Sequence, residues 1–131
     1  MARAALTLTA AIAALALALG LGLPHAQAAP GPEAKREIAA LMGALEHSGC
    51  RFERNGAWHD PAAARAHLQR KYDALLRRGL VDTAEQFIER AASRSSMTGR
   101  AYHVRCGTGP VREADGWFRE QLQRVRAGGG R

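Results

Sequence analysis

Apolar residues recur along the chain at two different periods, and each period predicts a different kind of element. From residue 33 to residue 47 the apolar positions follow the period of one helical face. Comparable stripes predict further helices over residues 61–78, 84–92 and 113–126. The residues that form these stripes include Ile38, Leu41, Leu68, Tyr72, Phe87, Trp117 and Phe118. Each helix is therefore expected to bury one face in a common core.

Two other segments alternate apolar and polar residues, as a half-buried strand does. They are Cys50–Arg54 and Tyr102–Cys106. Asn55-Gly56 follows the first and favours a tight hairpin, because its turn needs two residues with positive φ. The return strand is Ala57–His59. We therefore predict an α+β domain of about four helices with a small three-stranded antiparallel sheet.

Capping signals mark the start of two of the predicted helices. Asp60 before Pro61 is typical of an N-cap followed by the first helical residue. Thr83 and Gln86 have the spacing of a capping box at the start of the third helix. At the other end of the chain, the glycine-rich residues 127–131 are expected to form a disordered tail.

The first residues of the chain predict export. Arg3 precedes an apolar run from Ala4 to Leu23, and Ala26-Gln27-Ala28 offers the small residues that a signal peptidase recognises. We expect a signal peptide at 1–28, a linker at 29–32 and one α+β domain at 33–126. An uncleaved membrane anchor is the alternative, since about 20 apolar residues can span a bilayer. The run is mostly alanine and glycine, so cleavage is preferred, with no stable membrane anchor afterwards.

The chain is basic, with 19 Lys and Arg against 12 Asp and Glu and a formal net charge of +7. This balance indicates either a solvated surface or attraction to an anionic partner such as a lipid headgroup. A nucleic-acid partner is not expected, because only Trp58 accompanies Arg54, and stacking surfaces use several aromatic residues. Trp58 and Trp117 are instead expected to be core residues.

Cys50 and Cys106 are the two cysteines of the chain, and an even pair in an exported protein predicts a disulfide. Redox catalysis is not expected, because it usually uses a C-x-x-C arrangement. If the two residues face each other on antiparallel strands, the register of the strands follows from the alternation of side chains. The resulting pairs are Phe52 with Val104, Arg54 with Tyr102, Glu53 with His103, and Arg51 with Arg105. The last pair opposes two like charges.

Polar residues from separate segments form the candidate site. They are Arg54, His67, Lys71, Ser95, Ser96, Thr98 and Arg100. If these segments converge, they make one polar cleft suited to an anionic ligand; the alternative is a buried hydrogen-bond network that fixes a turn. In either case His67 is expected to bond the turn that holds Ser95 and Ser96.

The same residues also suggest a catalytic alternative, a small serine hydrolase in which Ser95 or Ser96 is the nucleophile and His67 the base. The chain lacks a G-x-S-x-G elbow, and serines in such a turn usually bond local backbone groups. No cofactor or metal is expected, because the histidines do not have the spacing of metal ligands.

Several short motifs resemble the YfeK-like family of small exported proteobacterial proteins, whose function is unknown. They are Phe52–Gly56, Ala64–Leu68 with Lys71, Asp82–Ile88, and Ala92–Arg100 with Tyr102 and Val104. The resemblance implies a signal peptide, a single α+β domain and a periplasmic location, but no reaction. The sequence as a whole favours a periplasmic or secreted, non-enzymatic binding or accessory module that binds an unknown envelope component. The sequence does not distinguish such a module from a purely structural partner of an envelope complex.

Overall fold

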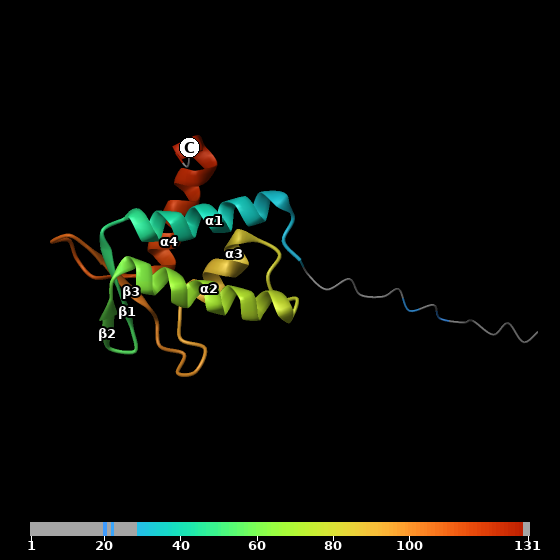
Figure 1. The fold of residues 1–131 in the computed structure, drawn as a ribbon, viewed down its shortest axis with the longest axis horizontal. Helices are drawn as coiled ribbons and strands as arrows, with labels where there is room; N and C mark the ends of the chain where they lie inside the picture. Colours follow the sequence, from blue (N-terminus) through green and yellow to red (C-terminus); the bar gives the residue numbers. More distant parts are fainter. Residues whose placement is uncertain (1–19, 21, 23–28, 130–131) are drawn as a thin grey trace, which may run out of the picture.

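The computed structural model describes residues 20, 22 and 29–129 (Figure 1). Almost all of the predicted signal peptide lies outside these residues. Within them, no helix is long and apolar enough to cross a membrane.

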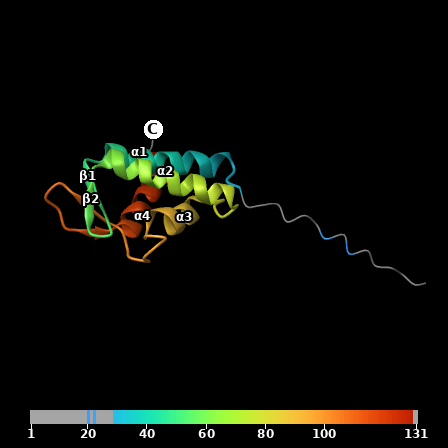
Figure 2. The same cartoon turned by 60° about the horizontal axis from the view of Figure 1, so that its bottom comes forward.

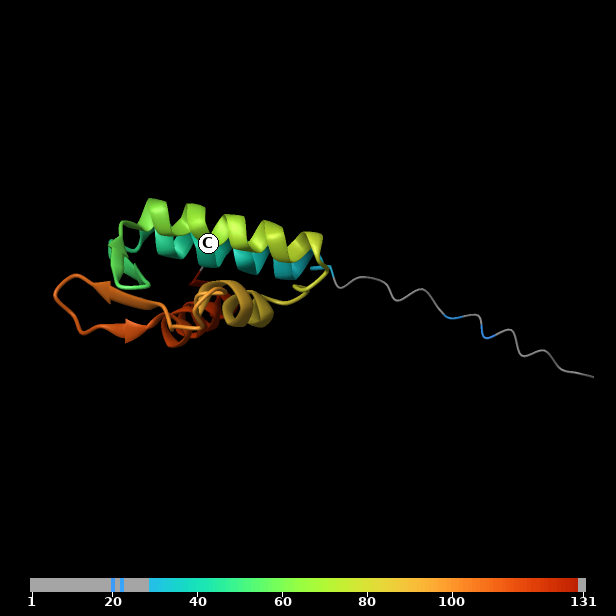
Figure 3. The same cartoon turned by 90° about the horizontal axis from the view of Figure 1, so that it is seen from below.

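The helices form two layers with the sheet at one end (Figure 1, Figure 2). Helices α1 (Pro32–His47) and α2 (Pro61–Arg77) lie side by side in one layer. Helices α3 (Ala84–Phe87) and α4 (Ala114–Arg124) form the other layer, which is seen below the first in Figure 3. The predicted apolar faces meet between the layers, where Leu41, Leu68, Phe87 and Phe118 are fully buried.

Two helices end differently from the prediction. The third predicted helix is α-helical only as far as Phe87 and continues as a π-helical turn, Ile88–Ala92. The last helix continues from Arg124 into the segment Val125–Gly129, in which Gly128 leaves the helical conformation with a φ of 86°. This segment overlaps the predicted tail of residues 127–131, of which residues 130 and 131 lie outside the described residues.

The sheet has four strands rather than the predicted three, in the order β2-β1-β3-β4, and all neighbours are antiparallel. The strands are β1 (Cys50–Arg54), β2 (Ala57–His59), β3 (His103–Cys106) and β4 (Arg112–Glu113). A strand of two polar residues shows no alternation, so β4 leaves no signal in the sequence. It pairs with β3 because the chain reverses after Cys106, whose carbonyl accepts from the amide of Gly109 at 3.0 Å.

The predicted register between β1 and β3 is confirmed. The paired residues are Cys50 with Cys106, Arg51 with Arg105, Phe52 with Val104, and Glu53 with His103. The ladder stops there, so the further pair predicted between Arg54 and Tyr102 is not part of it. On the other edge of β1, Arg54 pairs with Ala57 of β2. Phe52 and Val104 are buried on the inner face, at 1% and 0% exposure.

The two strands are joined by the predicted disulfide between Cys50 and Cys106, whose Cα atoms are 4.0 Å apart. The hairpin turn also has the predicted geometry, with φ of 50° at Asn55 and 85° at Gly56. The predicted N-caps are present as well: Asp60 accepts from the amide of Ala63 and Thr83 from that of Gln86.

The expectation that both tryptophans are core residues is confirmed for Trp117 and wrong for Trp58. Trp117 is 4% exposed, whereas Trp58 is 38% exposed. Trp58 pairs with Glu53, and the alternation along β1 puts Glu53 on the outer face of the sheet because Phe52 faces inward. The side chain of Trp58 therefore points away from the core.

Reduction of the disulfide should lower the free energy of unfolding by about 4 kcal/mol, because the bond closes a long loop with a sequence separation of 56. The measurement is urea denaturation of the oxidised protein and of the C50S/C106S variant. A difference of less than about 1 kcal/mol would show that the chain-entropy account of this bond is wrong.

Candidate functional site

The hydroxyl of Tyr102 is the point where two of the predicted polar residues, His67 and Lys71, meet. Tyr102 comes directly before β3 and is 1% exposed, and its ring packs on that of Phe52 with centroids 5.1 Å apart. Its hydroxyl lies 3.2 Å from Nε2 of His67 and accepts a hydrogen bond from Nζ of Lys71 at 3.1 Å. One buried oxygen therefore joins two side chains of α2 to the sheet.

Lys71 has two further interactions that fix its position. Its ammonium donates to the carbonyl of Arg94 at 2.7 Å and lies 4.7 Å from the centroid of the Tyr102 ring. The second contact is a cation–π interaction. Lys71 thus holds the segment after the third helix against α2, instead of extending freely into water.

We call Arg54, His67, Lys71 and Tyr102 the Tyr102 cluster. Burial, together with the charges of Arg54 and Lys71, lowers the pKa of His67 to about 4. Burial and the charge of Arg54 lower the pKa of Lys71 to about 8. Burial raises the pKa of Tyr102. Among the described residues, the charges that shift His67 and Lys71 are all positive.

These pKa values give the hydrogen bonds a direction. His67 is neutral at pH 7, so its Nε2 is able to accept the hydroxyl proton of Tyr102. The same hydroxyl oxygen accepts from Lys71. The tautomer with the proton on Nδ1 of His67 is inferred from this network. The chain of donors then runs from Lys71 through Tyr102 to His67.

The turn that follows Arg94 is fixed by its own hydroxyl groups. Oγ of Ser95 accepts from the amides of Met97 and Thr98 at 3.3 and 3.2 Å, and from Nδ2 of Asn55 at 3.3 Å. Oγ1 of Thr98 donates to Oδ1 of Asn55 at 2.8 Å. The side chain of Asn55 thereby ties the β1–β2 hairpin to this turn.

The structure brings some of the predicted site residues together and leaves others apart. His67 and Lys71 meet at Tyr102, while Ser95 and Thr98 meet at Asn55. Ser96 and Arg100 are exposed, and the amide of Arg100 donates to Thr98 at 3.3 Å.

The expected contact of His67 with the serine turn is wrong. His67 bonds Tyr102, and Lys71 reaches the neighbouring carbonyl of Arg94 in its place. The sequence does not single out Tyr102 or Asn55 as a site residue. The strand pattern already accounts for Tyr102, and the hairpin turn already accounts for Asn55.

The hydrolase alternative finds no support in these contacts. Ser95 is 5% exposed, and its oxygen is occupied by two amides and Asn55. His67 bonds Tyr102 and not a serine. In the described part of the chain, no three His, Cys, Asp or Glu side chains come together as a metal site.

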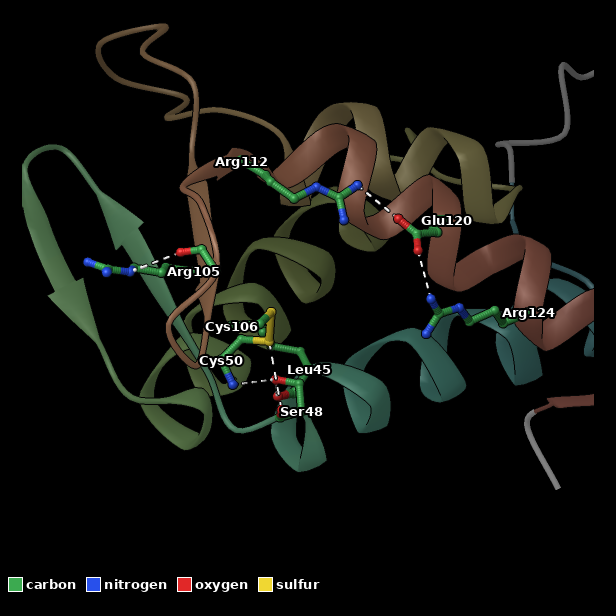
Figure 4. The surroundings of a disulfide bond; sticks show 9 residues. Leu45, Ser48, Cys50, Arg105, Cys106, Arg112, Glu120 and Arg124 are labelled. Atoms are coloured by element: carbon green, nitrogen blue, oxygen red, sulfur yellow. Dashed lines mark hydrogen bonds and ion pairs between the residues drawn. A yellow bond between two sulfur atoms is a disulfide. The ribbon is translucent and has the colours of Figure 1, made fainter.

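A cleft lies beside the disulfide, whose surroundings Figure 4 shows, and none of the residues that line it belongs to the Tyr102 cluster. It has a volume of about 600 Å³, and both cysteines and Trp117 line it. At its rim, Glu120 accepts from Arg112 at 2.8 Å and from Arg124 at 2.7 Å. The arginines of this cleft are therefore already neutralised in part, unlike Arg54 and Lys71.

The fold and the site define a small disulfide-linked α+β domain with a cationic cluster. Residues 32–126 match the model of a family described as a family of unknown function, DUF5329, and the chain belongs to this family. It is 42% identical over 66 residues to "Uncharacterized protein YfeK" of Salmonella typhimurium. That match covers 50% of this chain and 53% of the relative, about half the length of each. The predicted YfeK-like resemblance is thus confirmed, while no solved structure matches the chain.

The low pKa of His67 predicts how stability depends on pH. The unfolded chain takes up a proton on His67 near pH 6.5, whereas the folded protein takes it up only near pH 4. As far as His67 is concerned, the free energy of unfolding therefore has its full value above pH 6.5 and decreases as the pH falls from 6.5 toward 4. The H67Q variant should lack this part of the decline in urea denaturation. An NMR titration in which His67 titrates near its ordinary value would contradict the prediction.

Proposed function

We propose that this protein is an exported, non-enzymatic binding module of the cell envelope that takes an anionic ligand at the Tyr102 cluster. The observation that carries the proposal is the meeting of Lys71 and His67 on the buried hydroxyl of Tyr102. Within residues 29–129, the charges that shift the pKa values of these two side chains are positive, with Arg54 acting on both. A cationic site without a carboxylate is electrostatically incomplete, and a bound anion would complete it.

The cationic groups are costly to the folded protein in the absence of a ligand. Arg54 disfavours the charged form of Lys71, and both disfavour the charged form of His67. A bound anion would favour the charged form of each group, so its binding would raise both pKa values. Ligand binding and proton uptake are therefore linked at this site.

The site also has a fixed frame. The buried ring of Tyr102 and the carbonyl of Arg94 hold Lys71, and the hairpin turn that follows Arg54 is tied by Asn55 to the serine turn. A site whose side chains are already ordered loses little entropy on binding. The hydroxyl groups of Ser95 and Thr98 are used in the hydrogen bonds of this frame, which supports binding rather than catalysis.

Export is the second part of the proposal. It rests on the apolar leader with its Ala26-Gln27-Ala28 cleavage signal, and on the disulfide of Cys50 and Cys106. Disulfides persist in oxidising compartments such as the bacterial periplasm. The location that fits both observations is the periplasm.

Sulfate is a suitable probe of the anion site, because its charge does not change across the pH range of interest. In NMR titrations at constant ionic strength, sulfate should shift the amides around Lys71 and Arg94 and raise the pKa of His67. The K71M variant should bind sulfate at least about tenfold more weakly, since a charged partner is removed. Binding to the wild type should weaken as the pH rises through about 8, where Lys71 loses its proton.

The chain offers a matched control in Lys35, which is its other lysine and is exposed on α1. K35M removes the same charge and should leave sulfate binding unchanged. Equal losses in K35M and K71M would mean that only the net charge of the protein attracts sulfate. Such a result, or binding that does not change between pH 7 and pH 9, would reject the anion site.

A further inference from the structure

The outer face of the sheet carries two arginines that oppose each other. Arg51 of β1 pairs with Arg105 of β3, so both side chains leave the sheet on the same side. Like charges directly opposite on neighbouring strands destabilise a sheet. Both residues are exposed, and among the described residues neither has an acidic partner.

The neighbouring pair on the same face shows the opposite arrangement. Glu53 and His103 are the next pair along the ladder on this face, and their side chains bond each other at 2.8 Å. The sheet therefore has one matched pair and, beside it, one pair of unneutralised arginines. A bound anion would give Arg51 and Arg105 an oppositely charged partner.

A hollow of about 450 Å³ lies at this pair, lined by Gly49, Arg51, Trp58, Arg105 and Gly107. Trp58 is the aromatic residue that is exposed on this face, at 38%. A Cβ atom at Gly49 or Gly107 would meet nothing within 4 Å, so there is open space beside both glycines. We call these five residues the arginine–tryptophan hollow.

Arg105 is oriented by the hairpin that it begins. Its Nε donates to the carbonyl of Gly109 at 3.2 Å. In Figure 4 its guanidinium points away from Arg112 and Glu120, which belong to the cleft on the other side of the sheet. The disulfide lies one position along the ladder from the arginine pair, so it holds the two strands together where the charges repel each other.

We propose that the arginine–tryptophan hollow is a second binding site, for a ligand in which a flat apolar ring carries an oxyanion such as a carboxylate, sulfonate or phosphate. Guanidinium groups match such oxyanions in geometry, and two of them share the charge. The indole of Trp58 offers the apolar surface for the ring. The volume of the hollow is within the range of sites for small organic ligands.

This inference is independent of the proposed function, because the two sites share no residue. Arg51, Trp58 and Arg105 form the hollow, whereas Arg54, His67, Lys71 and Tyr102 form the Tyr102 cluster. Substitutions in one site should leave binding at the other unchanged.

The test compares two fluorescent probes with closely related ring systems, one with a sulfonate and one without. Anilinonaphthalene sulfonate carries the anion, and phenylnaphthylamine is its uncharged analogue. R51Q and R105Q should each weaken binding of the sulfonate at least about tenfold and change binding of the uncharged probe by less than about twofold. W58A should weaken binding of both probes.

Two control variants remove the same charge elsewhere. R77Q changes an exposed arginine on α2, and R124Q changes an arginine of the cleft beside the disulfide. Neither should weaken binding of the sulfonate. R51Q should also unfold at a temperature no lower than the wild type, because it removes a repulsion; loss of binding then does not come from loss of folding.

Two results would overturn the inference. One is binding of the sulfonate within about twofold of wild type in both R51Q and R105Q. The other is a loss in R124Q that equals the loss in R51Q, which would place the probe in the cleft beside the disulfide or show that only net charge matters.

Discussion

The bond between Cys50 and Cys106 is the constraint on which the rest of the structure depends. It joins the first residue of β1 to the last residue of β3 and so fixes which residues of the two strands face each other. A slip of one position would turn either Phe52 or Val104 out of the core, because side chains alternate along a strand and only one of the two strands could keep its face. The bond therefore determines the inner face, the outer face and the point where the chain enters β3.

This register gives β1 and β3 a buried inner face and an exposed outer face, which have different roles. The inner face completes the core below α1 and α2, with Phe52 packed on the ring of Tyr102. Tyr102 in turn offers its hydroxyl to His67 and Lys71, which links the sheet to α2. The outer face carries the arginine pair beside the exposed Trp58, and the bond that orders the core also holds this pair. One covalent link thus positions both candidate sites.

The parts of the fold that the sequence predicts are those with a local or a covalent cause. The hairpin turn at Asn55-Gly56, the N-cap at Asp60 and the β1–β3 register each depend on neighbouring residues or on one bond. Strand β4 could not be predicted, because its two residues pair only after the chain has reversed. The π-helical turn Ile88–Ala92 was missed for a similar reason, since an apolar stripe does not distinguish it from the α-helix that precedes it.

The sequence predicts that some polar side chains lie near each other, but it does not predict their hydrogen-bond partners. The one-turn spacing of His67 and Lys71 placed them together, but the sequence does not say which group a side chain will bond. Tyr102 was assigned to the alternating pattern of a strand, which hides the role of its hydroxyl. The small number of aromatic residues favours a core position for Trp58, although its position opposite Glu53 puts it outside.

Native-state hydrogen exchange across the β1–β3 ladder, with the disulfide intact and after its reduction, tests this account most directly. If the bond holds the strands against the repulsion of Arg51 and Arg105, reduction should expose the amides at that end of the ladder first. The amides near Glu53 and His103, whose side chains attract each other, should keep most of their protection. An equal loss at both ends, or no loss at the arginine pair, would contradict the central role given to the disulfide.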